Sequence, residues 1–253
     1  MSRTSALLLA RIIADELIQQ GALAVVLMGS VARGDARGDS DLDLYAIGEG
    51  PEYQLAHRSE FLISISWRTV LEIRNAMFSP AECVVLIPGW RDAIILADPH
   101  GIGTDLRNAA FAWRWRDIDQ DACDRWVAEE VTGFAEEVHK LLGLLEQGDD
   151  LTAAAQRTIL ALRLAIPLAV HYRLLYHSEN HLWLEMSSIL GEEWAKAQAA
   201  AFGLNGASSE HAVLASLKLF TIASHTVQSV ANPRQKQVLL AAERAITARR
   251  SMP

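Results

Sequence analysis

Cysteine is scarce in this sequence. Cys83 and Cys123 are the only two cysteines in 253 residues, and they stand too far apart to form a CxxC pair or another zinc-binding spacing. A small secreted domain held together by disulfides needs a larger set of cysteines. The sequence therefore predicts neither a disulfide framework nor a structural zinc site.

Positive charge is also in short supply. The chain has 23 Lys and Arg against 31 Asp and Glu, which gives a formal net charge of −8. General nucleic-acid binders present a basic surface to the phosphates, so we expect no nucleic-acid partner. An acidic balance would instead suit a cationic small molecule.

Long apolar runs are missing as well. The run from Ala6 to Ala10 is ended by Arg11 and is too short for the apolar region of a signal peptide. A second run, residues 159–170, contains Arg163 and Pro167 and does not read as a membrane span. We therefore expect a cytoplasmic protein without a transmembrane segment.

The first 117 residues carry a mixture of helix and strand patterns. Residues 5–19 have the apolar stripe of an amphipathic helix, and residues 61–67 alternate apolar and polar side chains as a half-buried strand does. Further strands are expected at residues 22–28 and 42–47, and a hairpin of residues 83–87 and 93–96 around Pro88. These patterns predict a mixed sheet with helices.

The pattern of apolar and polar residues changes after Pro99, His100 and Gly101. Helical patterns then follow one another with few strand candidates, at residues 121–147, 151–176, 181–190, 192–202 and 209–230. We place the domain boundary near residue 117, with domains 1–117 and 118–253. The predicted fold class is α+β, with an N-terminal mixed-sheet domain followed by a C-terminal α-helical bundle.

The stretch from Leu27 to Leu44 is the most informative part of the sequence. A strand ends in Gly29 and Ser30, where glycine lets the backbone approach a ligand and the small hydroxyl adds a donor. A turn or short helix carrying Arg33 follows, and exposed N–H groups with a guanidinium can cradle a triphosphate. The chain then returns through Ser40 into a second strand.

That second strand opens with Asp41, Leu42 and Asp43. Residues two apart on a strand share a face, so both carboxylates should point to one spot while the leucines enter the core. Two convergent carboxylates are costly unless a cation joins them, and hard oxygen ligands suit Mg²⁺. A surface loop rich in Gly, Asp and Arg is the alternative interpretation, but the combined spacing favours a metal and phosphate site.

These residues resemble the signature of the nucleotidyltransferase superfamily, a Gly-Ser followed about ten residues later by Asp-x-Asp. Over most of its length the chain also looks like the kanamycin nucleotidyltransferase group. The resemblance implies a nucleotidyltransferase (polymerase-beta-like) sheet domain with a helical bundle, often dimeric. It implies binding of Mg²⁺ and of ATP or another NTP as co-substrate. The implied site residues are Gly29, Ser30, Arg33, Ser40, Asp41 and Asp43. The implied reaction transfers AMP to a hydroxyl of a small acceptor, with an aminoglycoside-like compound as one candidate.

Two positions depart from the family pattern. The family's third carboxylate corresponds here to Ser64, and Glu60 lies too far along the strand to replace it. A gap-free match puts Gly133 where the family carries its general base. Four glutamates flank that position within about one helical turn, and we take Glu130 as the candidate base. The four are Glu129, Glu130, Glu136 and Glu137.

These departures leave other functions open. The motif is also similar to the minimal nucleotidyltransferases of toxin–antitoxin pairs, which suggests a protein-directed adenylyltransferase as one alternative. A nucleotide-binding protein that has lost turnover is another.

Two lesser signals are a group of His, Tyr and Arg side chains at residues 171–177 and alternating Trp and Arg at residues 113–116. The first could line an acceptor pocket, and for the second packing is the simpler interpretation.

Overall fold

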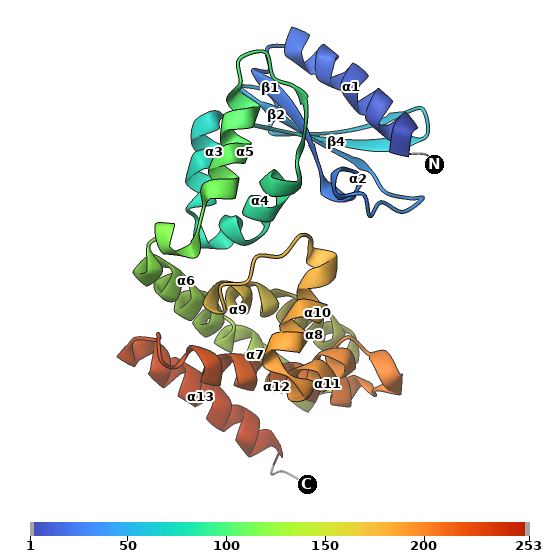
Figure 1. Ribbon diagram of the computed structural model, residues 1–253. Helices are drawn as coiled ribbons and strands as arrows, with labels where there is room; N and C mark the ends of the chain where they lie inside the picture. Colours follow the sequence, from blue (N-terminus) through green and yellow to red (C-terminus); the bar gives the residue numbers. More distant parts are fainter. Residues whose placement is uncertain (1–2, 251–253) are drawn as a thin grey trace. The chain divides into compact units, whose positions relative to one another are not determined.

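The computed structural model describes residues 3–250. It divides the chain into two compact units, Met1–Ile118 and Asp119–Pro253. The first contains the strands and the second is helical, so the predicted α+β class is confirmed (Figure 1).

The first unit is built on a five-stranded mixed sheet in the order β3-β4-β2-β1-β5. Strands β2 and β4 run parallel, and the other neighbouring pairs are antiparallel. The strands are β1 (Ala24–Met28), β2 (Leu42–Ile47), β3 (Tyr53–Arg58), β4 (Phe61–Arg68) and β5 (Ile94–Ala97), and the helices are α1 (Arg3–Gln19), α2 (Gly29–Arg33), α3 (Val70–Met77), α4 (Pro80–Asp92), α5 (Ile102–Ala112) and the 3₁₀ turn η1 (Trp115–Asp117).

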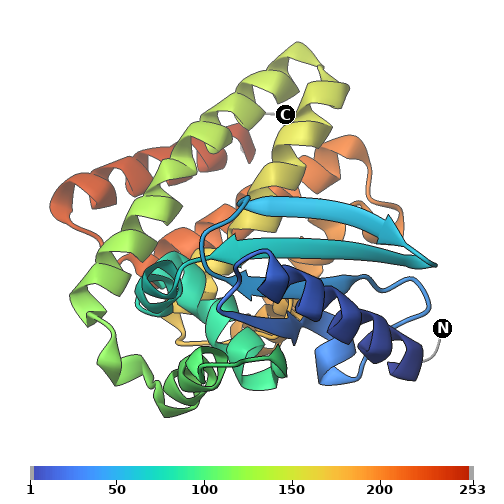
Figure 2. The same cartoon turned by 90° about the horizontal axis from the view of Figure 1, so that it is seen from above.

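Helices cover both faces of this sheet. The buried side of α1 packs on one face, together with alternate residues of β1, β2 and β4 such as Leu27, Leu44 and Ile63. Helices α3, α4 and α5 lie on the other side (Figures 1 and 2). Gly103 of α5 approaches Val26 there. Because successive strand residues point to opposite faces, Asp43 and Ser64 lie on this second face.

The predicted alternation in β4 is confirmed. Phe61, Ile63, Ile65 and Trp67 are buried, whereas the residues between them are exposed or half-buried. The neighbouring strand β3 was not predicted, because all six of its side chains are exposed and a strand without a buried face has no apolar period. It exists through backbone pairing with β4 along its whole length.

The predicted hairpin around Pro88 is wrong. Residues 80–92 form helix α4, and only β5 remains as a strand. Pro80 stands at the start of the helix, where its fixed φ and missing N–H cost nothing. Cys83, Val84, Ile87 and Trp90 are fully buried, a spacing of three to four residues that is typical of a helix. Pro88 lies inside the helix, so the turn interpretation gave this one residue too much weight.

The second unit is a bundle of helices. Two predicted long helices are each divided, with α6 and α7 meeting at Phe134 and α8 and α9 meeting at Leu164. Helix α13 was not predicted; half of its residues are polar or charged, and among its described side chains Leu239, Ala242 and Ile246 belong to the buried core. The helices are α6 (Gln120–Gly133), α7 (Ala135–Gln147), α8 (Asp150–Arg163), α9 (Ala165–His171), α10 (Glu179–Leu190), α11 (Glu192–Ala201), η2 (Leu204–Gly206), α12 (Ser209–Val227) and α13 (Pro233–Arg250).

One stretch of the second unit, Asp150–His171, is long and apolar enough to cross a membrane by length and composition, and half of it is buried inside the protein. It comprises α8 and α9, whose buried residues include Leu160 and Leu168. Core helices of water-soluble proteins have the same character, and we interpret these two as core helices.

Candidate functional site

The end of β1 places Gly29 directly against Asp43. Strand β1 is buried throughout, and its last residue Met28 is paired with Asp43 of β2. Gly29 has φ +70°, a left-handed conformation that side chains disfavour. A Cβ atom at Gly29 would collide with Oδ2 of Asp43. Glycine is therefore required here by both the backbone conformation and the carboxylate beside it.

Strand β2 positions the two aspartates as a pair. Leu42 and Leu44 are buried, while Asp43 is half-buried on the opposite face of the strand. Asp41 directly precedes the strand and is also half-buried. The charge of Asp41 raises the pKa of Asp43, so the two carboxylates are close enough to repel each other.

Several groups act on the ionisation of Asp43. Burial is the largest cause that raises its pKa, and the charge of Asp41 is the second. The hydrogen bond from Ser64 and the charge of Arg33 lower it, but the net direction is upward from 3.8. A half-buried carboxylate beside a second carboxylate is an environment that a divalent cation would relieve.

Ser64 occupies the position next to this pair. The parallel pairing of β2 with β4 sets Ser64 opposite Asp43, and its Oγ donates a hydrogen bond of 2.9 Å to Oδ1 of Asp43. Within the described residues no group of three or more His, Cys, Asp or Glu side chains could hold a metal. The donor set that fits Mg²⁺ here is therefore two carboxylates, with a hydroxyl in place of a third.

Two of the remaining predicted residues of this motif, Ser40 and Arg33, have structural partners. The side chain of Ser40 accepts a hydrogen bond of 2.8 Å from the backbone N–H of Arg37, which fixes the turn leading into β2. Ser30 lies in the first turn of α2. Arg33 ends that helix, and its Nε lies 3.2 Å from Oδ2 of Asp35. Its charge also lowers the pKa of Asp43, so Arg33 lies near enough to the aspartate pair to act on it.

Glu130 and its neighbours belong to the second unit. Glu130 is half-buried on α6, and Glu129 is exposed. Glu136 and Glu137 are engaged by Lys140 at 2.8 and 3.7 Å. Gly133 is the last residue of α6, and a Cβ there would meet open space. Glu130 as the general base stays a prediction.

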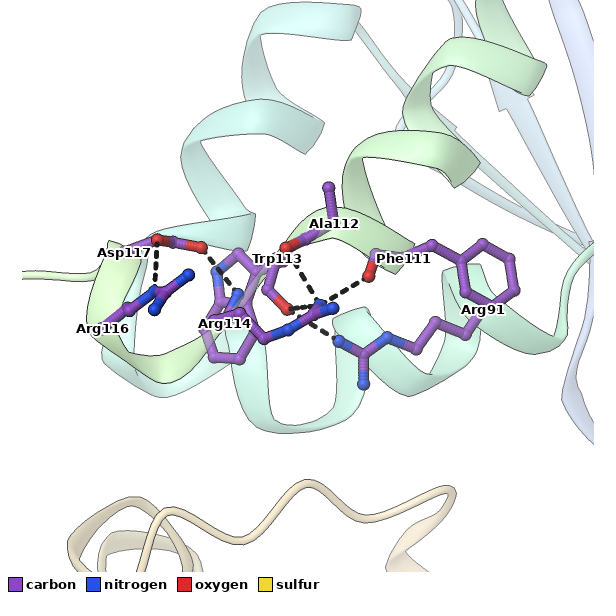
Figure 3. A network of polar contacts seen from close by, with 7 residues as sticks. All are labelled: Arg91, Phe111, Ala112, Trp113, Arg114, Arg116 and Asp117. Carbon is purple, nitrogen blue, oxygen red and sulfur yellow. Dashed lines mark hydrogen bonds and ion pairs between the residues drawn. The ribbon is translucent and has the colours of Figure 1, made fainter.

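The Trp and Arg residues at 113–116 serve the packing of the first unit. Nη1 of Arg114 donates to the carbonyl oxygens of Phe111, Ala112 and Trp113, and Arg91 donates to the carbonyl of Trp113 from α4 (Figure 3). These carbonyls lie at the C-terminal end of α5, where they lack helical partners and attract cations. Trp113 is buried. The two arginines therefore cap a helix.

The polar group at residues 171–177 is built around the end of α9. Arg173 has φ +56°, donates to the carbonyl of Val170 and reaches Oδ1 of Asp124 at 3.2 Å. Burial lowers the pKa of His171, whose ring packs edge-to-face on Tyr172. Arg173 thus closes α9 and ties it to α6, which is a structural role. The acceptor-pocket interpretation stays a prediction.

The raised pKa of Asp43 predicts an effect of pH and mutation on stability. The pKa of Asp43 is higher in the folded protein than the ordinary value of 3.8. Ionising this carboxyl therefore lowers the free energy of unfolding as the pH rises from 3.8, and the full loss of stability is present above the raised pKa. Without metal at pH 7, Asp43→Asn should therefore raise Tm by a few degrees, at roughly 2–4 °C per kcal/mol recovered for a chain of this size. Thermal unfolding followed by circular dichroism measures this.

Added Mg²⁺ should reverse which of the two proteins, wild type or Asp43→Asn, has the higher Tm. Added Mg²⁺ should raise the Tm of the wild type, since a ligand that binds only the folded state stabilises it, and should raise that of Asp43→Asn much less. Asp15→Asn, an exposed change on α1, is the control. A drop in the Tm of metal-free Asp43→Asn would contradict the predicted strain at this site.

The chain is similar to known proteins in part of its sequence and in its fold. Residues 10–99 match the model of the nucleotidyltransferase domain family. The chain is similar in fold to a solved nucleotidyltransferase-like protein from Exiguobacterium sibiricum, at 14% identity and a TM-score of 0.51, over 87% of this chain and 73% of that one. No curated protein matches the chain. The match over residues 10–99 supports a nucleotidyltransferase-like first unit and nucleotidyl transfer as its general chemistry, and the resemblance to the kanamycin group stays a prediction.

Proposed function

We propose that this protein transfers a nucleoside monophosphate, AMP by preference, from an NTP to a hydroxyl group of a small molecule in the cytoplasm, with Mg²⁺ as cofactor. The observation that carries the proposal is the half-buried Asp43, packed against Gly29, repelled by Asp41 and held by Ser64. A carboxylate pair kept at such a cost beside a glycine turn is typical of a site for a divalent cation and phosphates.

The reaction forms one bond and breaks one. The acceptor oxygen attacks the α-phosphorus of the NTP, the bond from that phosphorus to the bridging oxygen breaks, and pyrophosphate leaves. Mg²⁺ held by Asp41 and Asp43 would neutralise charge on the phosphates and polarise the phosphorus. Arg33, whose charge acts on Asp43, adds positive charge near the same place. The proton of the acceptor passes to a base, for which Glu130 is the candidate.

The test of this function uses purified protein with ATP labelled at the α-phosphate, Mg²⁺ and a panel of hydroxylated compounds that includes aminoglycosides. Label on a small molecule, absent with Asp43→Asn, is the expected result. Label on protein alone would point to a protein-directed adenylyltransferase. ATP binding without any transfer would indicate a domain that has lost turnover, the reading that Ser64 motivates.

Ser64 offers a second test of the same chemistry. Ser64→Asp places a carboxylate beside Asp43, where it can complete the ligand set, and we expect the transfer rate to rise, by up to about tenfold. Ser64→Asn has the same size without the charge and should lower the rate, since it alters the hydrogen bond to Asp43. An unchanged or lower rate for Ser64→Asp, with the fold intact by circular dichroism, would remove the argument from a missing third ligand.

A further inference from the structure

Arg3 begins helix α1 with a positive charge that this end of a helix disfavours. The free N–H groups of a helix N-terminus carry partial positive charge, so acidic side chains stabilise that end and basic ones do not. The first turn of α1 contains no acidic residue, and among the described residues Arg3 has no carboxylate partner. A side chain that conflicts with its own helix in this way often serves a contact elsewhere in the fold.

The contact that Arg3 makes is with helix α2. Its Nη2 donates a hydrogen bond of 3.1 Å to the carbonyl oxygen of Ala32, 29 positions further along the chain, where the start of α1 lies next to α2 (Figure 1). The guanidinium also covers Gly34, because a Cβ atom at Gly34 would lie 3.3 Å from Nη1 and 3.4 Å from Cζ of Arg3. Arg3 therefore packs on the C-terminal end of α2.

Helix α2 needs a partner at this end. It has five residues, and a helix of little more than one turn is not stable by itself. The last carbonyl groups of a helix have no partners inside it. Here the carbonyl of Ser30 accepts hydrogen bonds from the backbone N–H groups of Gly34 and Asp35, and Arg3 donates to the carbonyl of Ala32. The end of α2 is thus closed by a backbone turn and by one side chain from α1.

Helix α2 carries two of the residues that a nucleotide would use. Ser30 lies in its first turn and Arg33 is its last residue. Arg33 directly follows Ala32, so the carbonyl that Arg3 holds belongs to the peptide bond that leads into Arg33. Resting on the proposed function, we propose that Arg3 is a positioning residue for nucleotide binding, which fixes the end of α2 so that the Arg33 guanidinium is held in place for the triphosphate.

The experiment compares Arg3→Gln and Arg3→Lys with the wild type. Glutamine removes the charge and is too short to reach Ala32, so we expect the Kd and the KM for ATP with Mg²⁺ to rise roughly 5- to 20-fold, the size of effect for one lost hydrogen bond to a charged group. The kcat should change less than about twofold, because Arg3 acts on nucleotide binding and the aspartates are untouched. Lysine keeps the charge and a donor, and Arg3→Lys should recover most of the affinity for ATP.

Calorimetric titration with ATP and Mg²⁺, without an acceptor, measures Kd in the absence of turnover, and initial rates give KM and kcat. The matched control is Arg11→Gln, which removes the same charge from an exposed position of α1. It should change Kd and KM less than about twofold, as surface substitutions usually do. A purely structural role of Arg3 would lower Tm and leave the Kd of the folded protein unchanged.

The outcomes separate this role from the proposed function. Equal affinity for ATP in Arg3→Gln and Arg11→Gln would overturn the role of Arg3 and leave the proposed function in place. A fall in kcat at unchanged KM would also overturn it. A wild-type protein that binds no ATP would overturn the proposed function and the role of Arg3 together.

Discussion

Asp41→Asn and Asp43→Asn should each reduce nucleotidyl transfer by at least 10²–10³-fold, the size of effect seen when one group stabilising transition-state charge is removed. Asparagine keeps the shape of the side chain but supplies a neutral oxygen that binds a divalent cation poorly. Because the two aspartates act on one cation, the double variant should be hardly worse than either single one. Initial rates with labelled ATP measure the loss.

Folding must be separated from chemistry in this experiment. Both variants should unfold cooperatively, and the metal-free Asp43→Asn protein should be at least as stable as the wild type because the strained charge is gone. Asp15→Asn, which alters an exposed aspartate of α1, should keep full activity. If Asp43→Asn retains more than about a tenth of the wild-type rate, these residues do not hold the catalytic cation.

Gly29→Ala should have the second-largest effect. The added Cβ would collide with Oδ2 of Asp43 and would force alanine into a left-handed backbone at φ +70°. That conformation alone costs about 1–2 kcal/mol, which corresponds to a fall in Tm of several degrees. Since the carboxylate must also move, we expect the transfer rate to fall by about 10²-fold or more.

Gly38→Ala is the matched control for this change. Gly38 lies in the loop between α2 and β2, has no positive φ, and a Cβ there would meet nothing within 4 Å. It should leave Tm and transfer rate nearly unchanged. A Gly29→Ala protein with the stability and rate of the Gly38→Ala protein would show that Asp43 does not need the close approach.

The motif residues were predictable because their spacing is short. Gly29, Asp41 and Asp43 lie within fifteen positions of one another, and strand geometry alone puts the two aspartates on one face. Burial of the intervening Leu42 agrees with that expectation. The fold class was equally accessible, since the change from strand to helix patterns after residue 101 is visible in local apolar periods.

Helix α4 and strand β3 were not accessible in the same way. Pro88 suggested a turn, but the burial of Ile87 and Trp90 against the rest of the unit stabilises a helix that contains it. Strand β3 has no buried side chains, and its backbone pairing with β4 holds it in the sheet. In both cases tertiary contacts outweigh the local preference of a few residues.

By itself, the sequence determined the α+β class and the Gly-Ser and Asp-x-Asp spacing on which the phosphate and metal hypothesis rests, because each depends on residues close together in the chain. The tertiary structure decided that Ser64 bonds to Asp43, that Gly29 is pressed against the same carboxylate, and that Arg3 reaches the end of α2. Those facts depend on strand order, register and the placement of α1, which bring together residues 14 to 29 positions apart. No local pattern encodes such pairings, since they are selected by the packing of the whole unit.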